Sequence, residues 1–152
     1  MKKTHVILIV TLSIALLFNC KNETKKADVA SVTSIEHLVE TPQDIIDGLS
    51  LVPLQTFKGK DDYLVVVEHQ RLIEQLQPNF RALIQLSSRG TIVTAPGDTV
   101  DFVSRCFFPQ AGIDEDPTTG SAHTTMTPYW AKRLGKNELT AMQLSSRVGH
   151  LK

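Results

Sequence analysis

The sequence predicts an α+β fold in which an antiparallel sheet wraps around one helix. Short apolar, β-branched runs such as Tyr63 to Val67 and Thr91 to Ala95 are bounded by turn-forming residues, which is the pattern of β-strands. Residues 120–134 form one longer segment that carries no charged side chain before Lys132. A helix with so little polar surface is expected to be buried, and strands in hairpins around a buried helix indicate the α+β class.

Local signals place the other elements along the chain. Pro42 favours the first turn of a helix, whereas Pro53 weakens a strand that would contain it. Pro78 ends one helix, and Asn79 is a suitable N-cap for the next. The expected elements are helices at 41–48, 70–77 and from 79 to before Gly90, and strands at 51–57, 63–67, 91–95, 100–108 and 139–144.

The strand expected at 100–108 has two faces, because successive side chains of a strand point to opposite sides. One face would carry Asp101, Val103, Arg105 and Phe107, and the other Phe102, Ser104, Cys106 and Phe108. We expect Cys106 to be a small buried apolar residue rather than a reactive thiol.

The start of the helix at 120–134 is the strongest candidate for a binding site. An acidic loop, 112–119, leads into it, and the first backbone N–H groups of a helix have no partner within the helix. Unpaired amides and the helix dipole together attract anions, and Gly120 lets a ligand approach the backbone closely. The spacing indicates a carboxylate or small-anion site beside Asp116 and Ser121.

Each of these residues also has a purely structural interpretation. Asp116 precedes Pro117 and is equally suited to capping a helix, and Ser121 can cap a turn in a protein that binds nothing. Arg105 would organise Asp116 or a substrate, or form a structural ion pair, which is the commoner case. His123 fits a hydrogen-bonded interior residue better than a catalytic base.

The first 40 residues predict export and anchoring. Lys2 and Lys3 precede an apolar run, 6–18, which is short for a membrane span and typical of a signal peptide. It ends at Cys20 in a sequence similar to a lipoprotein processing site, so 1–20 is interpreted as a signal peptide with Cys20 as the lipidated residue. Residues 21–40 form a polar tether. An uncleaved anchor or a buried helix is the alternative interpretation.

Charge and motif content exclude several functional classes. The chain has 16 basic and 16 acidic residues, which gives no electrostatic basis for nucleic-acid binding. The five histidines show no metal-ligand spacing, and no phosphate-binding loop or dinucleotide motif occurs.

Several motifs, in the same order along the chain, resemble those of PhzF-like proteins, the phenazine-biosynthesis-type isomerases that share the diaminopimelate epimerase fold. The most specific is Asp116-Pro117-Thr118-Thr119-Gly120-Ser121-Ala122-His123, followed by Pro128-Tyr129-Trp130-Ala131 and Leu134-Gly135-Lys136; similar stretches are 61–66, 76–80, Arg89-Gly90, 94–98 and 101–105. The resemblance covers 41–152 and corresponds to the second lobe of a two-lobed protein.

The resemblance implies a strongly curved, nearly barrel-like sheet around a central helix, with a last hairpin that is missing or cut short here, so that the lobe is incomplete. It also implies cofactor-independent transfer of a proton between carbons of a small carboxylate substrate. Asp116 and Ser121 would be catalytic, Gly120, Ser121 and Ala122 would bind the carboxylate, and Arg105 and His123 would support them. The family's essential Glu belongs to the first lobe, which this chain does not contain.

Three hypotheses follow for the function. The chain is one lobe of a PhzF-like isomerase that becomes active only if another chain supplies a first lobe. The expected protein partner is such a first-lobe chain or a second copy of this chain in a homodimer. Alternatively, the chain is a catalytically inactive, lipid-anchored lobe that binds an anion or a partner protein. The third hypothesis is a leader joined to a fragment of an enzyme gene. The leader predicts the cell envelope, and an unused leader would leave the protein in the cytoplasm.

Overall fold

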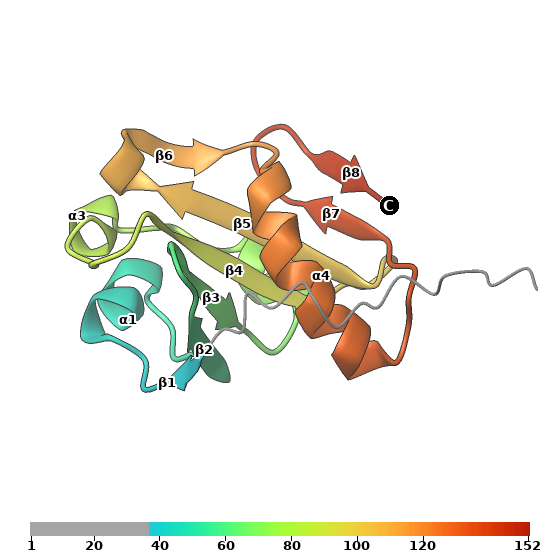
Figure 1. The fold of residues 1–152 in the computed structure, drawn as a ribbon. Helices are drawn as coiled ribbons and strands as arrows, with labels where there is room; N and C mark the ends of the chain where they lie inside the picture. The colour runs from blue at the N-terminus through green and yellow to red at the C-terminus, as the bar shows by residue number, and fades with distance from the viewer. Residues whose placement is uncertain (1–36) are drawn as a thin grey trace, which may run out of the picture.

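The computed structural model describes residues 37–152 (Figure 1). The expected signal peptide, Cys20 and most of the expected tether lie outside these residues. The elements, in chain order, are β1 (His37–Val39), α1 (Gln43–Leu49), β2 (Gln55–Lys58), β3 (Asp62–Val66), α2 (Gln70–Glu74), α3 (Phe80–Leu83), β4 (Gly90–Pro96), β5 (Phe102–Phe108), the 3-10 helix η2 (Pro109–Ala111), β6 (Ile113–Asp116), α4 (Gly120–Leu134), β7 (Ala141–Gln143) and β8 (Gly149–Leu151).

The strands form one mixed sheet in the order β1-β2-β3-β4-β5-β7-β8, with β6 also paired to β5. The predicted antiparallel sheet is wrong at two pairs, because β3 runs parallel to β4 and β5 runs parallel to β7. Each parallel pair is joined by a helical crossover, α2 and α3 in one case and α4 in the other. Parallel neighbours require such crossovers, whereas a hairpin turn can only join antiparallel strands.

The sheet is covered on both faces. Alternate residues of its central strands enter two separate cores, as the period of a strand requires. Val65, Val93, Val103 and Phe107 pack with apolar side chains of α1, α2 and α3. Leu64, Ile92, Phe102, Cys106 and Phe108 pack against α4. The predicted two faces of strand 100–108 are confirmed.

Helix α4 is less buried than the sequence predicted. Figure 1 shows it lying across one face of an open sheet, so the expected near-barrel is wrong. Only one stripe, Ala122, Met126 and Trp130, is fully buried. The exposed positions of the helix are mostly Ser, Thr and basic residues, which tolerate water. The small number of charged residues in α4 therefore did not indicate a helix that is buried on all sides.

Three short strands were not predicted. β6 lies within the expected acidic loop, where its pairing with β5 orders the acidic residues. β1 lies within the expected tether and pairs with β2. β8 follows the strand expected at 139–144, which is β7, and forms a short hairpin with it. No helix within residues 37–152 has the length and apolar content needed to cross a membrane.

Candidate functional site

The turn before α4 is shaped by Asp116. Its Oδ2 accepts a hydrogen bond from Thr119 Oγ1 at 2.7 Å, and its Oδ1 accepts one from the Thr118 amide at 3.4 Å. Buried Gln143 on β7 supports the same turn, because it accepts from the Thr119 amide at 2.8 Å and donates to the Asp116 carbonyl at 2.6 Å. The helix N-cap is Thr119 rather than Asp116.

The first three amides of α4 make no hydrogen bond within residues 37–152; Gly120 and Ser121 are exposed, whereas Ala122 is fully buried. Gly120, Ser121 and Ala122 are the first residues of the helix, so their N–H groups have no intrahelical acceptor. Among residues 37–152, no other acceptor lies within hydrogen-bond distance of them. A methyl group at Gly120 would meet no atom within 4 Å, so the space beside the helix end is open.

A cavity of about 180 Å³ lies at this helix end. It is lined by Arg89, Phe108, Ala111, Ile113, Asp116, Thr119 and Ser121. The lining combines an arginine, a carboxylate and hydroxyl groups with an aromatic ring and two aliphatic side chains. This composition suits a small ligand that has one anionic end and an apolar body.

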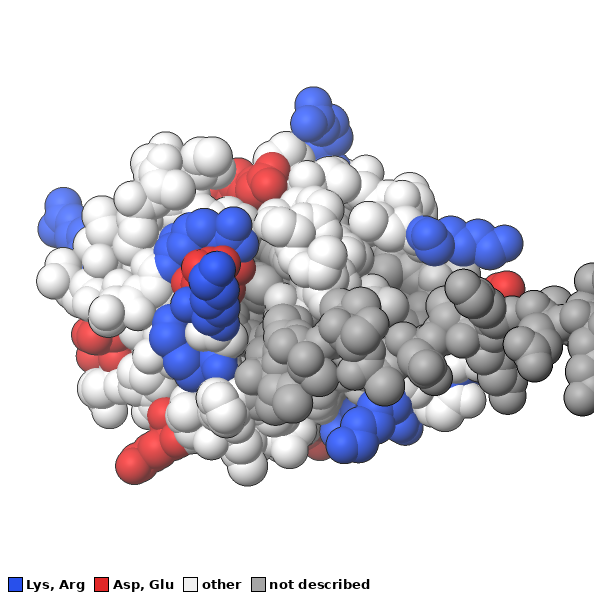
Figure 2. All heavy atoms as spheres, viewed as in Figure 1, with Lys and Arg blue, Asp and Glu red and all other residues white. Residues whose placement is uncertain are grey.

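Arg89 is the one charged residue of this cavity that the site prediction missed. It lies just before β4 and forms an ion pair with Asp62 at the start of β3. The hydrogen bond with Asp62 raises the pKa of Arg89 above its usual value. Arg89-Gly90 is one of the motifs that resemble the family. Arg89 is far from Ser121 in the sequence, so the sequence did not indicate that the two side chains lie close together. On the face seen in Figure 2, basic and acidic side chains lie in contact, as such ion pairs require.

Arg105 lies on the opposite face of the sheet from this cavity. Its Nε and Nη2 each donate to a carboxylate oxygen of Glu115 at 2.8 Å, and its Nη1 donates to the carbonyls of Ile73 and Leu76. The guanidinium therefore ties β5 to β6 and α2. The structure places it with Glu115 rather than with Asp116.

Replacing Arg105 with alanine is expected to lower the free energy of unfolding by about 2–4 kcal/mol, because Glu115 and the carbonyls of Ile73 and Leu76 lose a charged partner. Urea unfolding followed by circular dichroism measures this loss. The exposed Arg71→Ala serves as the control and should change stability by less than about 0.5 kcal/mol. If Arg105→Ala is as stable as wild type, Arg105 does not stabilise the fold by joining β5 to β6 and α2.

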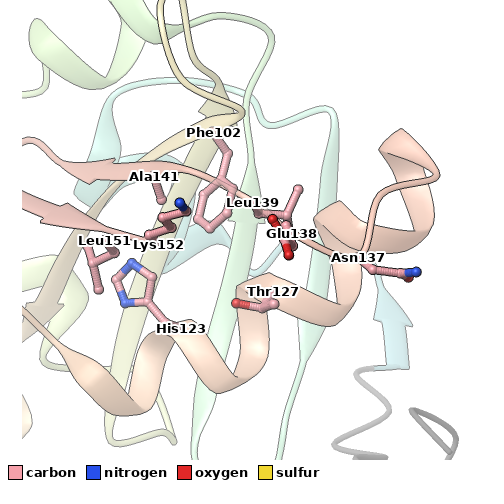
Figure 3. A pocket seen from close by; sticks show the side chains of 9 residues that line it. All are labelled: Phe102, His123, Thr127, Asn137, Glu138, Leu139, Ala141, Leu151 and Lys152. Atoms are coloured by element: carbon pink, nitrogen blue, oxygen red, sulfur yellow. The ribbon is translucent and has the colours of Figure 1, made fainter. Parts of the chain in front are cut away.

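His123 lines a different cavity, of about 450 Å³, between α4 and the last hairpin (Figure 3). Its Nδ1 lies 2.8 Å from the Thr119 carbonyl, so Nδ1 is the protonated, donating nitrogen. Its Nε2 is buried and has no partner among residues 37–152. The structure brings Asp116 and Ser121 to the lining of one cavity and leaves Gly120 exposed at the helix start beside it. Ala122, which is fully buried, His123 and Arg105 lie outside the cavity lining.

Cys106 is buried beneath the turn before α4, as predicted for a small apolar residue. Burial raises the pKa of its thiol to about 12, against the weaker opposing effect of a hydrogen bond with Thr119. The thiol is therefore protonated at pH 8, where a free cysteine is partly thiolate.

In a Cys20→Ser background, Cys106 should react with a disulfide reagent at pH 8 only as fast as the protein opens. The same protein in guanidinium chloride should react at once, which controls for reagent quality. Absorbance of the released thiolate measures both rates. Rapid reaction of the folded protein would show that the thiol is not protected.

Within residues 37–152, no three His, Cys, Asp or Glu side chains are grouped so that they could hold a metal ion. The functional groups at the start of α4 are instead amides, hydroxyls, one guanidinium and one carboxylate. They provide hydrogen-bond donors for an anion and one group that can exchange a proton.

The model of the family described as "Phenazine biosynthesis-like protein" matches residues 17–152. The chain belongs to this family. An uncharacterized isomerase of Halalkalibacterium halodurans is 46% identical over 113 residues, which cover 73% of this chain and 43% of the relative. An uncharacterized isomerase of Pseudomonas aeruginosa is 48% identical over 111 residues, 73% of this chain and 42% of the relative.

Solved structures of the phenazine biosynthesis family share the fold. A PhzF family protein of Enterococcus faecalis aligns with a TM-score of 0.73 and 39% identity, covering 76% of this chain and 45% of its own. A PhzC/PhzF protein of Clostridium difficile aligns with a TM-score of 0.70 and 34% identity, over 76% and 44% of the two chains. The chain therefore spans less than half the length of the relatives that it matches.

Proposed function

We infer that this chain is the carboxylate-binding lobe of a PhzF-like isomerase, which moves a proton between carbons of a small carboxylate substrate together with a first lobe. The observation that carries this proposal is the set of unpaired amides at the start of α4, next to a cavity that Asp116 and Ser121 line. Family membership and relatives named as isomerases support it.

In this proposal the substrate carboxylate binds the amides of Gly120, Ser121 and Ala122. Ser121 Oγ supplies a further donor, and the apolar part of the substrate contacts Phe108 and Ile113. These donors stabilise the negative charge that develops when a C–H bond next to the carboxylate is broken. Asp116 contacts a polar group of the substrate, while the first lobe supplies the Glu that removes the proton.

The binding half of the proposal is tested with benzoate, a carboxylate with an apolar body. Gly120→Val should abolish benzoate binding in isothermal titration calorimetry, because the added side chain occupies the open space beside the amides. The fold should tolerate it, since a first β-carbon at this position meets no atom within 4 Å. Thr124→Val, an isosteric change at an exposed position one turn further along α4, is the control. Unchanged affinity in Gly120→Val rules out the helix-end site.

The catalytic half is tested by adding the separately produced first lobe of a family member. The mixture in deuterium oxide should exchange deuterium into a cyclohexene carboxylate whose α-carbon is allylic, because such a C–H bond is acidic enough for a carboxylate base. Ser121→Ala should slow this exchange by about 10²-fold, which is typical for one lost oxyanion donor. No exchange with the wild-type mixture would leave a binding lobe without isomerase activity.

The alternative is an inactive lobe that binds an anion or a partner protein. The free amides favour it as much as they favour catalysis, since anion binding alone requires no base. Benzoate binding without exchange in the mixture would be its expected result. The lipid anchor at Cys20 and the cell-envelope location remain proposals in either case, and fatty-acid labelling of wild type against Cys20→Ser tests them.

A further inference from the structure

Arg89 is held rigidly at the wall of the cavity. Its Nε donates to Asp62 Oδ1 at 2.9 Å, and its Nη2 forms the second arm of the pair with Asp62 Oδ2. The guanidinium also lies over the ring of Phe108, 5.4 Å from its centre. Asp62 is only 8% exposed, so its carboxylate fixes the guanidinium on one side. A guanidinium held in this way loses little conformational entropy when a ligand binds.

Gly90 makes this arrangement possible. A β-carbon at this position would lie 2.1 Å from Cδ1 of Phe108 and 2.6 Å from the Phe107 carbonyl oxygen. The Phe108 ring therefore occupies the space that a side chain at position 90 would fill, and this places the ring beneath Arg89. The Arg89-Gly90 pair thus builds one wall of the cavity.

The guanidinium keeps donors that the protein does not use. Nη1 makes no hydrogen bond to any residue in 37–152, and Nη2 lies 3.5 Å from Ser121 Oγ, at the limit of a hydrogen bond. The side chain is 44% exposed. Charged donors are therefore available next to Ser121, the residue that carries one of the free amides of α4.

We propose that Arg89 is a specificity-determining residue of this site and recognises the same carboxylate as the helix end. This inference rests on the proposed function. One carboxylate oxygen accepts from Ser121 and the α4 amides, and the other accepts from the free donors of Arg89. A carboxylate fits because both of its oxygens are charged acceptors, so one can accept from the helix end while the other makes a charge-assisted hydrogen bond with Arg89. A neutral amide offers one acceptor and would place its own N–H groups against the arginine.

The test compares benzoate with benzamide, its neutral isostere, by isothermal titration calorimetry on the full 152-residue chain. Arg89→Gln should weaken benzoate binding about tenfold, the loss expected for one charge-assisted hydrogen bond, and should leave benzamide binding unchanged. Arg89→Lys should recover part of the preference for benzoate, because it keeps the charge without the fork. Arg71→Gln removes an exposed arginine on α2 and should change neither affinity.

The ratio of the two affinities separates recognition from structural support. If Arg89→Gln weakens benzoate and benzamide equally, Arg89 only maintains the cavity and the proposal is overturned. A second outcome would also overturn the proposal. If wild type binds benzoate and Gly120→Val does not, the helix-end site is supported. If Arg89→Gln then still prefers benzoate over benzamide as strongly as wild type does, Arg89 does not recognise the carboxylate. Absence of benzoate binding to wild type removes the proposed site itself.

Discussion

Replacing Trp130 with alanine should lower the free energy of unfolding by about 3–5 kcal/mol, the largest effect expected from a single substitution in this chain. Trp130 is fully buried and stacks on Phe102 with ring centres 5.8 Å apart. Its Nε1 donates to Thr94 Oγ1 at 3.0 Å on β4. The ring thus joins α4 to two central strands, and its loss leaves a cavity that rigid neighbours cannot fill.

Urea unfolding measures this effect, and Trp130→Phe is the matched variant. Phenylalanine keeps an aromatic ring against Phe102 but lacks the N–H, so it should cost less than half as much. The Thr94 hydroxyl keeps one partner in that variant, because it donates to the Val103 carbonyl at 2.8 Å. Equal stability of wild type and Trp130→Ala would mean that α4 does not pack on the sheet as described.

Gln143→Leu is expected to affect both stability and binding. The leucine has a similar volume but cannot accept from the Thr119 amide or donate to the Asp116 carbonyl, and both groups are close to the helix start. Unpaired buried polar groups of this kind cost about 1–3 kcal/mol each. The Asp116 carbonyl is only partly buried and costs less, so the free energy of unfolding should fall by about 2–4 kcal/mol. Benzoate affinity should fall by about tenfold as the turn loosens.

Met142→Leu is the control for this prediction, because it changes the neighbouring residue of β7 with nearly constant volume and touches no hydrogen bond of the turn. It should cost less than about 1.5 kcal/mol and leave benzoate binding unchanged. Calorimetry at a temperature where both variants are folded separates the two effects. A Gln143→Leu protein that binds benzoate with wild-type affinity would show that the turn does not need this support.

Features set by neighbouring residues were predictable from the sequence. Asn79 caps α3 as expected, with its side chain accepting from the Arg81 amide at 3.2 Å. The alternation of residues 102–108 between two cores follows from the geometry of a single strand. The position proposed for the anion site also has a local origin, since unpaired amides occur at the start of any helix.

Features set by distant residues were not predictable in the same way. Arg89 and Asp62 are 27 positions apart, and Gln143 and Thr119 are 24 apart. Each pair forms only when the sheet assembles, so neither has a pattern in the sequence. The pairing of β6 with β5 likewise forms only when the sheet assembles and has no pattern in the sequence. Glu115, a residue expected in a solvated loop, is therefore the partner of Arg105.

The most direct test of the central claim is a benzoate titration of the full chain followed by amide proton–nitrogen correlation spectra. We predict saturable shifts of the Gly120, Ser121 and Ala122 amides, with benzamide causing much smaller shifts at the same residues. Absence of saturable shifts at these three amides, or saturable shifts confined to the cavity around Phe102 and Leu151, would contradict the claim that the start of α4 binds a carboxylate.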